Sequence, residues 1–199
     1  MKMSKKLLKA VALVGCAVLL VAGSVAGTLA YLTSKTDTVT NTFTVGKVKI
    51  TLDETNVDLY GAKVDDTRVL TNEYKLIPGH TYIKDPTIHV AAGSEPCYLF
   101  VKITDGLSAI QDDTTIAKQL ENNGWTLVDG TTDIWSHAEI PTSTEIQDVK
   151  VFETIKIKAN ADVSGYAGEK LEVIAYAVQK DGFNTAKAAW DATKGSFAN

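Results

Sequence analysis

Metal-dependent chemistry in this chain would depend on three histidines, His80, His89 and His137. A zinc peptidase of the His-Glu-x-x-His type needs two histidines one helical turn apart, with a glutamate base between them. His80 and His89 instead flank a segment that contains Pro86, and the chain has no such motif. We expect surface or strand positions for these histidines, with their convergence into a zinc site as the open alternative.

The sequence supports a nucleophilic active site or a calcium site no better than it supports a zinc site. Ser136 and His137 are neighbours, but adjacency in sequence is not triad geometry, and no Gly-x-Ser-x-Gly elbow occurs. Cys97 lies in an apolar run, which favours a buried and unreactive thiol. The acidic pairs 65–66 and 112–113 lack the spaced ligands of a calcium loop. The sequence therefore predicts no catalytic residue, no metal ligand and no cofactor.

The N-terminal thirty residues have the pattern of a secretory signal peptide. Lysines precede an apolar stretch from Leu7 to Val25, and small residues follow it. Thr28 and Ala30 fit the positions that a signal peptidase reads, so we expect cleavage after Ala30 and a mature chain that begins at Tyr31. A transmembrane anchor and a lipoprotein signal at Cys16 are the alternatives. With cleavage, no stable membrane anchor is expected.

Cleavage would make the protein distinctly acidic. The full chain has 20 Lys and Arg against 24 Asp and Glu, and four of the lysines lie in residues 1–30. The remaining net charge of −8 argues against nucleic acid as a partner, because nucleic-acid-binding proteins present basic faces. Cys97 would be the only thiol left, so we expect no internal disulfide.

Period-two patterns predict a mainly β domain, an antiparallel β-sandwich with one or two short helices, over residues 47–199. Strands are expected at 47–52, 80–90, 97–103, 149–157 and 171–178. The runs 97–103 and 171–178 are apolar on both faces, which predicts central positions in a covered sheet. Helices are expected at 116–122 and 186–193, each with a threonine available as N-cap. Core positions are expected for Trp125, Trp135 and Trp190.

The segment before this domain has its own facing pattern. Val39, Phe43 and Val45 share one parity, whereas Val48, Ile50 and Leu52 share the other, so the apolar face changes side at Gly46. The glycine permits a hinge there. Residues 31–46 therefore form an arm, and its strand-forming part is Thr38, Val39, Thr40, Asn41, Thr42, Phe43, Thr44 and Val45. The arm either pairs within its own sheet or frays, or it adds to the sheet of a neighbouring molecule.

Several motifs resemble one family of exported proteins. The junction Gly-Thr-Leu-Ala-Tyr-Leu-Thr-Ser at 27–34 and the run Asp-Thr-Val-Thr-Asn-Thr-Phe-Thr-Val-Gly at 37–46 resemble the TasA/camelysin-like proteins, which a SipW-type signal peptidase processes. Further similarities are Ile-Pro-Gly at 77–79, Lys-Asp-Pro-Thr-Ile at 84–88, Glu-Pro-Cys-Tyr at 95–98, Tyr-Ala-Val-Gln at 176–179 and Ala-Ala-Trp at 188–190.

The resemblance implies a jelly-roll sandwich secreted by a Gram-positive-type bacterium and built into extracellular fibres of the biofilm matrix. It also implies a head-to-tail homopolymer, or assembly with related matrix subunits, in which the arm of one subunit completes the sandwich of the next. Two alternatives stay open at this point. One is a secreted camelysin-like metalloendopeptidase, for which the chain lacks a recognisable zinc motif, and the other is a monomeric adhesin or fibre-accessory module.

Overall fold

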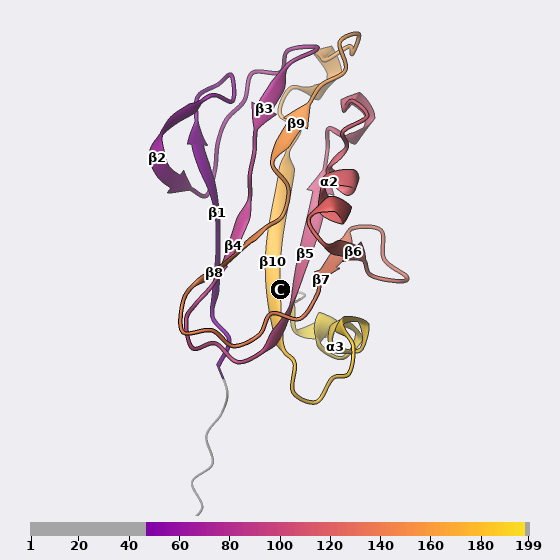
Figure 1. Ribbon diagram of the computed structural model, residues 1–199. Coiled ribbons are helices and arrows are strands. Elements are labelled where there is room, and N and C mark those ends of the chain that lie inside the picture. The colour runs from indigo at the N-terminus through magenta and orange to yellow at the C-terminus, as the bar shows by residue number, and fades with distance from the viewer. Residues whose placement is uncertain (1–46, 198–199) are drawn as a thin grey trace, which may run out of the picture. The chain divides into compact units, whose positions relative to one another are not determined.

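The computed structural model describes residues 47–197 (Figure 1). Contacts divide the chain into two units, Met1–Thr44 and Val45–Asn199, and the described residues all belong to the second unit. This unit is mainly β, as the sequence pattern predicts, with antiparallel sheets that are consistent with a β-sandwich.

Two four-stranded sheets and one two-stranded ribbon make up the β structure of residues 47–197. One sheet has the order β2-β1-β4-β8, with bounds Lys63–Val69, Ile50–Val57, Thr87–Val90 and Gln147–Lys150. The other has the order β10-β5-β7-β6, with bounds Leu171–Gln179, Cys97–Asp105, Ile134–His137 and Trp125–Leu127. The ribbon pairs β3, Thr81–Ile83, with β9, Thr154–Lys156.

The core lies between the sheets and is centred on β5. Its residues Cys97, Leu99 and Val101 are fully buried and pack with Ile88 and other residues of the facing sheet. Tyr98 and Phe100 on the opposite face of β5 are also buried, in a second cluster beneath the C-terminal helix. A central, doubly covered position for this strand is confirmed. The three tryptophans are confirmed as buried residues.

The two longest predicted strands are wrong as continuous elements. Residues 80–90 divide into β3 and β4, and residues 149–157 divide into β8 and β9. The breaks face each other, because Val151 N donates to Pro86 O and Lys84 N donates to Glu153 O. Pro86 has no N–H for a strand ladder, so regular pairing stops there and resumes in a different sheet.

Among the described residues, the central position predicted for residues 171–178 is also wrong, because β10 lies at the edge of its sheet. Strand β10 pairs along its whole length with β5, but no strand among residues 47–197 pairs with its other edge. Both of its faces are nevertheless largely apolar: Val173 packs on the inter-sheet core, and Val178 packs under the C-terminal helix. The pattern of apolar side chains along a strand predicts which of its faces are buried. It does not predict whether another strand pairs with each of its edges.

Both predicted helices are confirmed with their caps. Helix α2 spans Ile116–Asn122, and the Thr115 hydroxyl accepts a hydrogen bond from Lys118 N. Helix α3 spans Ala186–Thr193, and the Thr185 hydroxyl accepts from Ala188 N at 3.1 Å. A 3-10 helix, Lys194–Phe197, follows α3 directly, and further 3-10 turns occur at Ser108–Ile110 and Ser164–Tyr166.

Candidate functional site

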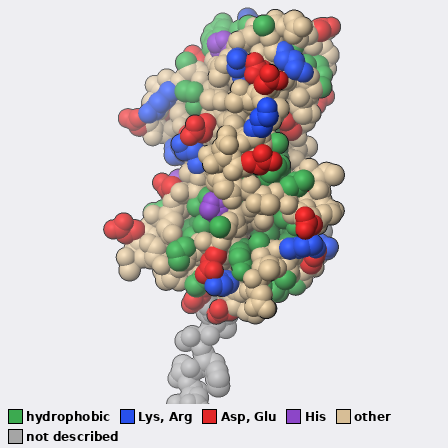
Figure 2. All heavy atoms as spheres, turned by 45° about the vertical axis from the view of Figure 1, so that its right-hand side comes forward, with side chains coloured by type: hydrophobic (Ala, Val, Ile, Leu, Met, Phe, Trp, Pro, Cys, Tyr) green, Lys and Arg blue, Asp and Glu red, His purple; other side chains and the backbone are tan. Residues whose placement is uncertain are grey.

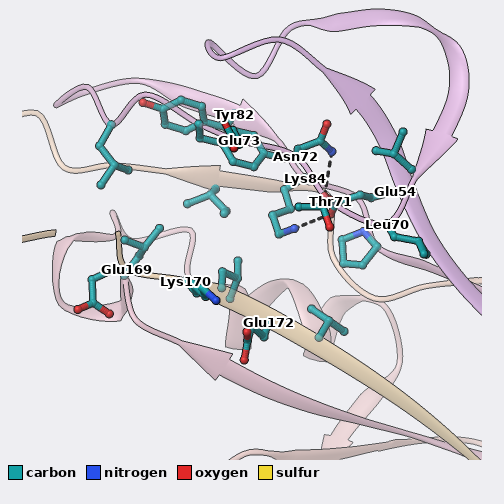
Figure 3. Close-up of a pocket in the computed structure, with 18 of the residues that line it drawn as sticks. Glu54, Leu70, Thr71, Asn72, Glu73, Tyr82, Lys84, Glu169, Lys170 and Glu172 are labelled. Atoms are coloured by element: carbon teal, nitrogen blue, oxygen red, sulfur yellow. Dashed lines mark hydrogen bonds and ion pairs between the residues drawn. The ribbon is translucent and has the colours of Figure 1, made fainter. Parts of the chain in front are cut away.

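A groove of about 1350 Å³ opens between the two sheets where β1 and β2 face β10 (Figure 3). Its volume exceeds the usual range of pockets for small molecules, about 300–1,000 Å³. Its apolar lining comes from β1, from the segment after β2, and from β10, and includes Leu52, Leu70, Leu76, Leu171 and Val173. The groove therefore has the size and lining that suit a stretch of polypeptide.

Unpaired strand edges border this groove. One is the edge of β10 that has no partner among the described strands. The other is the first half of β1, Ile50–Asp53, which among residues 47–197 pairs with β4 on one side only. Strand β2 covers the other side of β1 only from Glu54 on. An open strand edge presents unpaired backbone N–H and C=O groups and is a template for another strand. The groove thus combines an apolar floor with backbone groups that an added strand would use.

One buried polar cluster interrupts the apolar lining. The Lys84 ammonium lies 2.5 Å from Glu54 Oε2, and the Asn72 amide donates to Glu54 Oε1 at 2.8 Å (Figure 3). Side-chain exposure is only 6% for Glu54 and 11% for Lys84, so both charges depend on each other for stabilisation. Sequence reasoning missed this cluster, because its members are far apart in the chain and no local motif joins them.

Tyrosines form one end of the groove. Tyr74 and Tyr82 lie edge to face with ring centroids 5.5 Å apart, and the Tyr82 hydroxyl donates to Lys75 O and accepts from Ile77 N. Burial is the main reason that the pKa of Tyr74 is raised. These contacts hold the segment after β2 against β3, so this wall of the groove is well supported.

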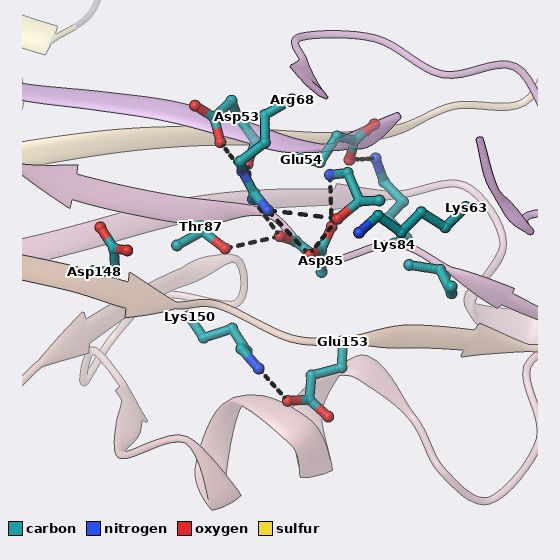
Figure 4. Close-up of polar contacts among 12 residues, drawn as sticks. Asp53, Glu54, Lys63, Arg68, Lys84, Asp85, Thr87, Asp148, Lys150 and Glu153 are labelled. Atoms are coloured by element: carbon teal, nitrogen blue, oxygen red, sulfur yellow. Dashed lines mark hydrogen bonds and ion pairs between the residues drawn. The ribbon is translucent and has the colours of Figure 1, made fainter. Parts of the chain in front are cut away.

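A network of charges covers the opposite face of the same sheet (Figure 4). Arg68 of β2 pairs with Asp53 of β1 and with Asp85, which precedes β4. Asp85 also accepts hydrogen bonds from the backbone N and the hydroxyl of Thr55, at 2.7 and 2.8 Å. One guanidinium and one carboxylate therefore tie β2, β1 and the entry of β4 together through charge-assisted hydrogen bonds.

His89 extends this network across β4. Its Nδ1 lies 2.6 Å from Asp148 Oδ1 of β8, and its Nε2 lies 2.9 Å from Asp53 Oδ1 of β1. A ring with carboxylates at both nitrogens donates at both only when it is protonated. Burial alone would lower the pKa of His89, but the hydrogen bonds and charges of the two aspartates outweigh it and raise that pKa. The strand position predicted for His89 is confirmed.

The structure does not bring the remaining chemical candidates together. His80 Nε2 contacts Tyr60 O at 2.7 Å, and His137 Nδ1 contacts Ala138 O at 3.1 Å. Cys97 is fully buried, as predicted, and burial raises its pKa to about 11. Within residues 47–197, no group of three or more His, Cys, Asp or Glu is arranged to hold a metal ion.

The predicted processing and assembly residues lie outside the described part of the chain. These are Ala30 and Tyr31 at the expected cleavage point, the expected assembly strand Thr38–Val45, and Gly46 at the expected hinge.

The surface carries charges of both signs. On the face drawn in Figure 2, acidic and basic side chains alternate over the whole described unit rather than forming one patch of a single sign. Among the helices that the structure describes, none combines the length and the apolar character that crossing a membrane requires.

No family model, curated protein or solved structure matches this chain. The family resemblance therefore stays a prediction from the sequence motifs.

Proposed function

We propose that the protein is a secreted structural subunit of extracellular matrix fibres, in which residues 31–46 of one subunit add a β-strand to the next. In this proposal the chain is exported, cleaved after Ala30, and assembled head to tail with further copies or with related matrix subunits. The proposal requires no catalytic residue and no cofactor, and its partners are other subunits and, during export, a signal peptidase.

The observation that carries the proposal is the mismatch between the sequence of β10 and its position. Its two faces have the apolar character of a central strand, yet one edge has no partner among residues 47–197 and borders an apolar groove. Long apolar edges promote uncontrolled association, and proteins normally protect them with charges, prolines or a covering segment. An added strand would give β10 the neighbour that its composition suits.

The arm has the features that this edge needs. It is rich in threonine and β-branched residues, which favour strands, and Val39, Phe43 and Val45 share one face. Burial of each large apolar side chain is worth about 1.5–3 kcal/mol. Ladder hydrogen bonds along the open edge would add about 0.5–1.5 kcal/mol each. These gains oppose the conformational entropy lost when the segment is ordered, about 1–2 kcal/mol per residue for the backbone.

The test compares the two faces of the arm. Replacement of Val39, Phe43 and Val45 by serine removes the apolar face and should abolish filaments of the chain that begins at Tyr31, as seen by electron microscopy and sedimentation. The matched control replaces Thr38, Thr40 and Thr42 by serine in the same arm and should still form filaments. Equal filament yield from the apolar-face variant and the wild type would refute strand donation.

A further inference from the structure

The inward face of the proposed donor strand is not uniformly apolar. Residues of one parity lie on one side of a strand, so Val39, Phe43 and Val45 share their face with Asn41. A buried amide without hydrogen-bond partners is costly, because the desolvation of its donors and acceptor is not compensated. An arm that buries this face therefore needs a polar partner at one position and apolar partners at the others.

The groove has a matching pattern. Its lining is mainly apolar, and the buried Lys84–Glu54–Asn72 cluster is a polar point within it. This cluster has unused hydrogen-bonding capacity: Lys84 has three ammonium hydrogens, and each Glu54 oxygen has two lone pairs. The amide of Asn41 could donate to Glu54 and accept from Lys84 without disrupting their existing contact.

We infer that this cluster sets the register of the incoming strand by receiving Asn41 of a second copy. The inference rests on the proposed function and adds the position at which the two subunits align. Residues on one face of a strand repeat about every 6.6–6.8 Å. For a strand on the open edge of β10, alignment of Asn41 across the groove from Glu54 therefore places Phe43 or Val39 across from Leu52, which is two residues from Glu54 on the same face of β1.

Other registers are less favourable. A slip by one residue turns the threonine face inward and the apolar face outward. A slip by two residues keeps the correct face inward but buries Asn41 against apolar lining, and it places Val39 or Phe43 against the two charges. Both errors leave buried polar groups without partners, so the cluster selects one alignment by penalising the alternatives.

The reach of the arm makes a second copy the source of the strand. Lys47 O accepts from Glu95 N, and Lys49 O accepts from Ala91 N, so the chain is still extended at residue 47. A tight reversal at residues 45–46 would place Thr44 beside Lys47 and hence Asn41 beside Ile50. Asn41 would then stay four residues, roughly 13 Å, short of Glu54. The arm of another molecule has no such limit.

A double-mutant cycle on filament assembly tests the register. Asn41→Leu should raise the critical concentration by about tenfold or more, because a leucine would cover the Lys84–Glu54 pair without the hydrogen bonds that the Asn41 amide would add to it. In a background with Glu54→Gln and Lys84→Met, the same Asn41→Leu change should alter the critical concentration by less than about threefold. Lys84→Met alone provides a second background, and circular dichroism identifies the backgrounds that fold.

Thr40→Leu is the matched control, because it adds the same side chain to the other face of the arm and should have the same effect in every background. An identical Asn41→Leu penalty in the wild-type and neutral backgrounds would overturn the register inference. That result would leave strand donation standing if the serine variants of the two arm faces still differ. Loss of that difference would instead remove the proposed function itself.

Discussion

At the level of single residues, His89 shows how one side chain can join three strands. Its ring lies between Asp53 of β1 and Asp148 of β8, and Asp53 also pairs with Arg68. Burial opposes ionisation of Asp53, but its bonds to Arg68 and His89 dominate and lower its pKa. The opposed shifts stabilise the charged forms of both partners.

Folding stability should depend on the protonation of His89. Because its pKa is raised in the folded state, its contribution is complete below the unfolded value of about 6.5 and is lost as the pH rises through the folded value. His89→Gln should therefore remove the fall in unfolding free energy that begins as the pH rises above about 6.5. Urea unfolding across this range measures the effect. His137→Gln is the control, and an unchanged pH slope in His89→Gln would contradict the assignment.

The sequence predicted the burial and the strand positions of these residues but not their interaction partners. The burial of Cys97 and the strand position of His89 followed from the apolar and alternating residues next to them. The partners of His89 did not, because Asp53 and Asp148 are distant in sequence and meet only through strand pairing. The Lys84–Glu54 pair escaped prediction for the same reason. A pattern of neighbours can predict burial, but it does not identify the partners of a buried charge.

At the level of elements, the helices were predicted better than the strands. Each helix carries its own start signal, a threonine before an amphipathic run, and each begins and ends where the sequence indicates. The interruption at Pro86 involves two chain segments at once, since 84–86 and 151–153 lose regular pairing together. The edge position of β10 depends likewise on which strands are its neighbours, and its own sequence does not contain that information.

The cap of α3 offers a test of this local encoding. Thr185→Ala removes the hydroxyl that accepts from Ala188 N and should lower the unfolding free energy by about 1 kcal/mol. Thr185→Ser keeps the hydroxyl and should stay close to the wild type. Chemical denaturation measures both variants. If Thr185→Ser lowered the unfolding free energy as much as Thr185→Ala, packing of the threonine methyl group, and not capping, would be responsible.

At the level of the whole molecule, the groove is the feature through which assembly would be controlled. A free peptide with the sequence of residues 31–46 should occupy the groove and, in excess, shorten the filaments in proportion to its concentration. A peptide with serine in place of Val39, Phe43 and Val45 should have no effect. Light scattering during assembly and electron microscopy of the end point provide the measurements. Full-length filaments at saturating native peptide would argue against the groove as acceptor.

The break between β3 and β4, which faces the break between β8 and β9, lies where a residue of the groove and a residue of the charge network are neighbours in the chain. Lys84 and Asp85 are consecutive, yet the first side chain enters the groove and the second joins the charges on the outer face (Figure 4). Glu54 and Asp53 divide in the same way on β1. In each of these two pairs of consecutive residues, one side chain lies in the groove and the other lies on the outer face of the sheet. A displacement of Lys84 by an inserted strand would reach Asp85, and through Arg68 and Asp53 the imidazole of His89, without passing through the hydrophobic core.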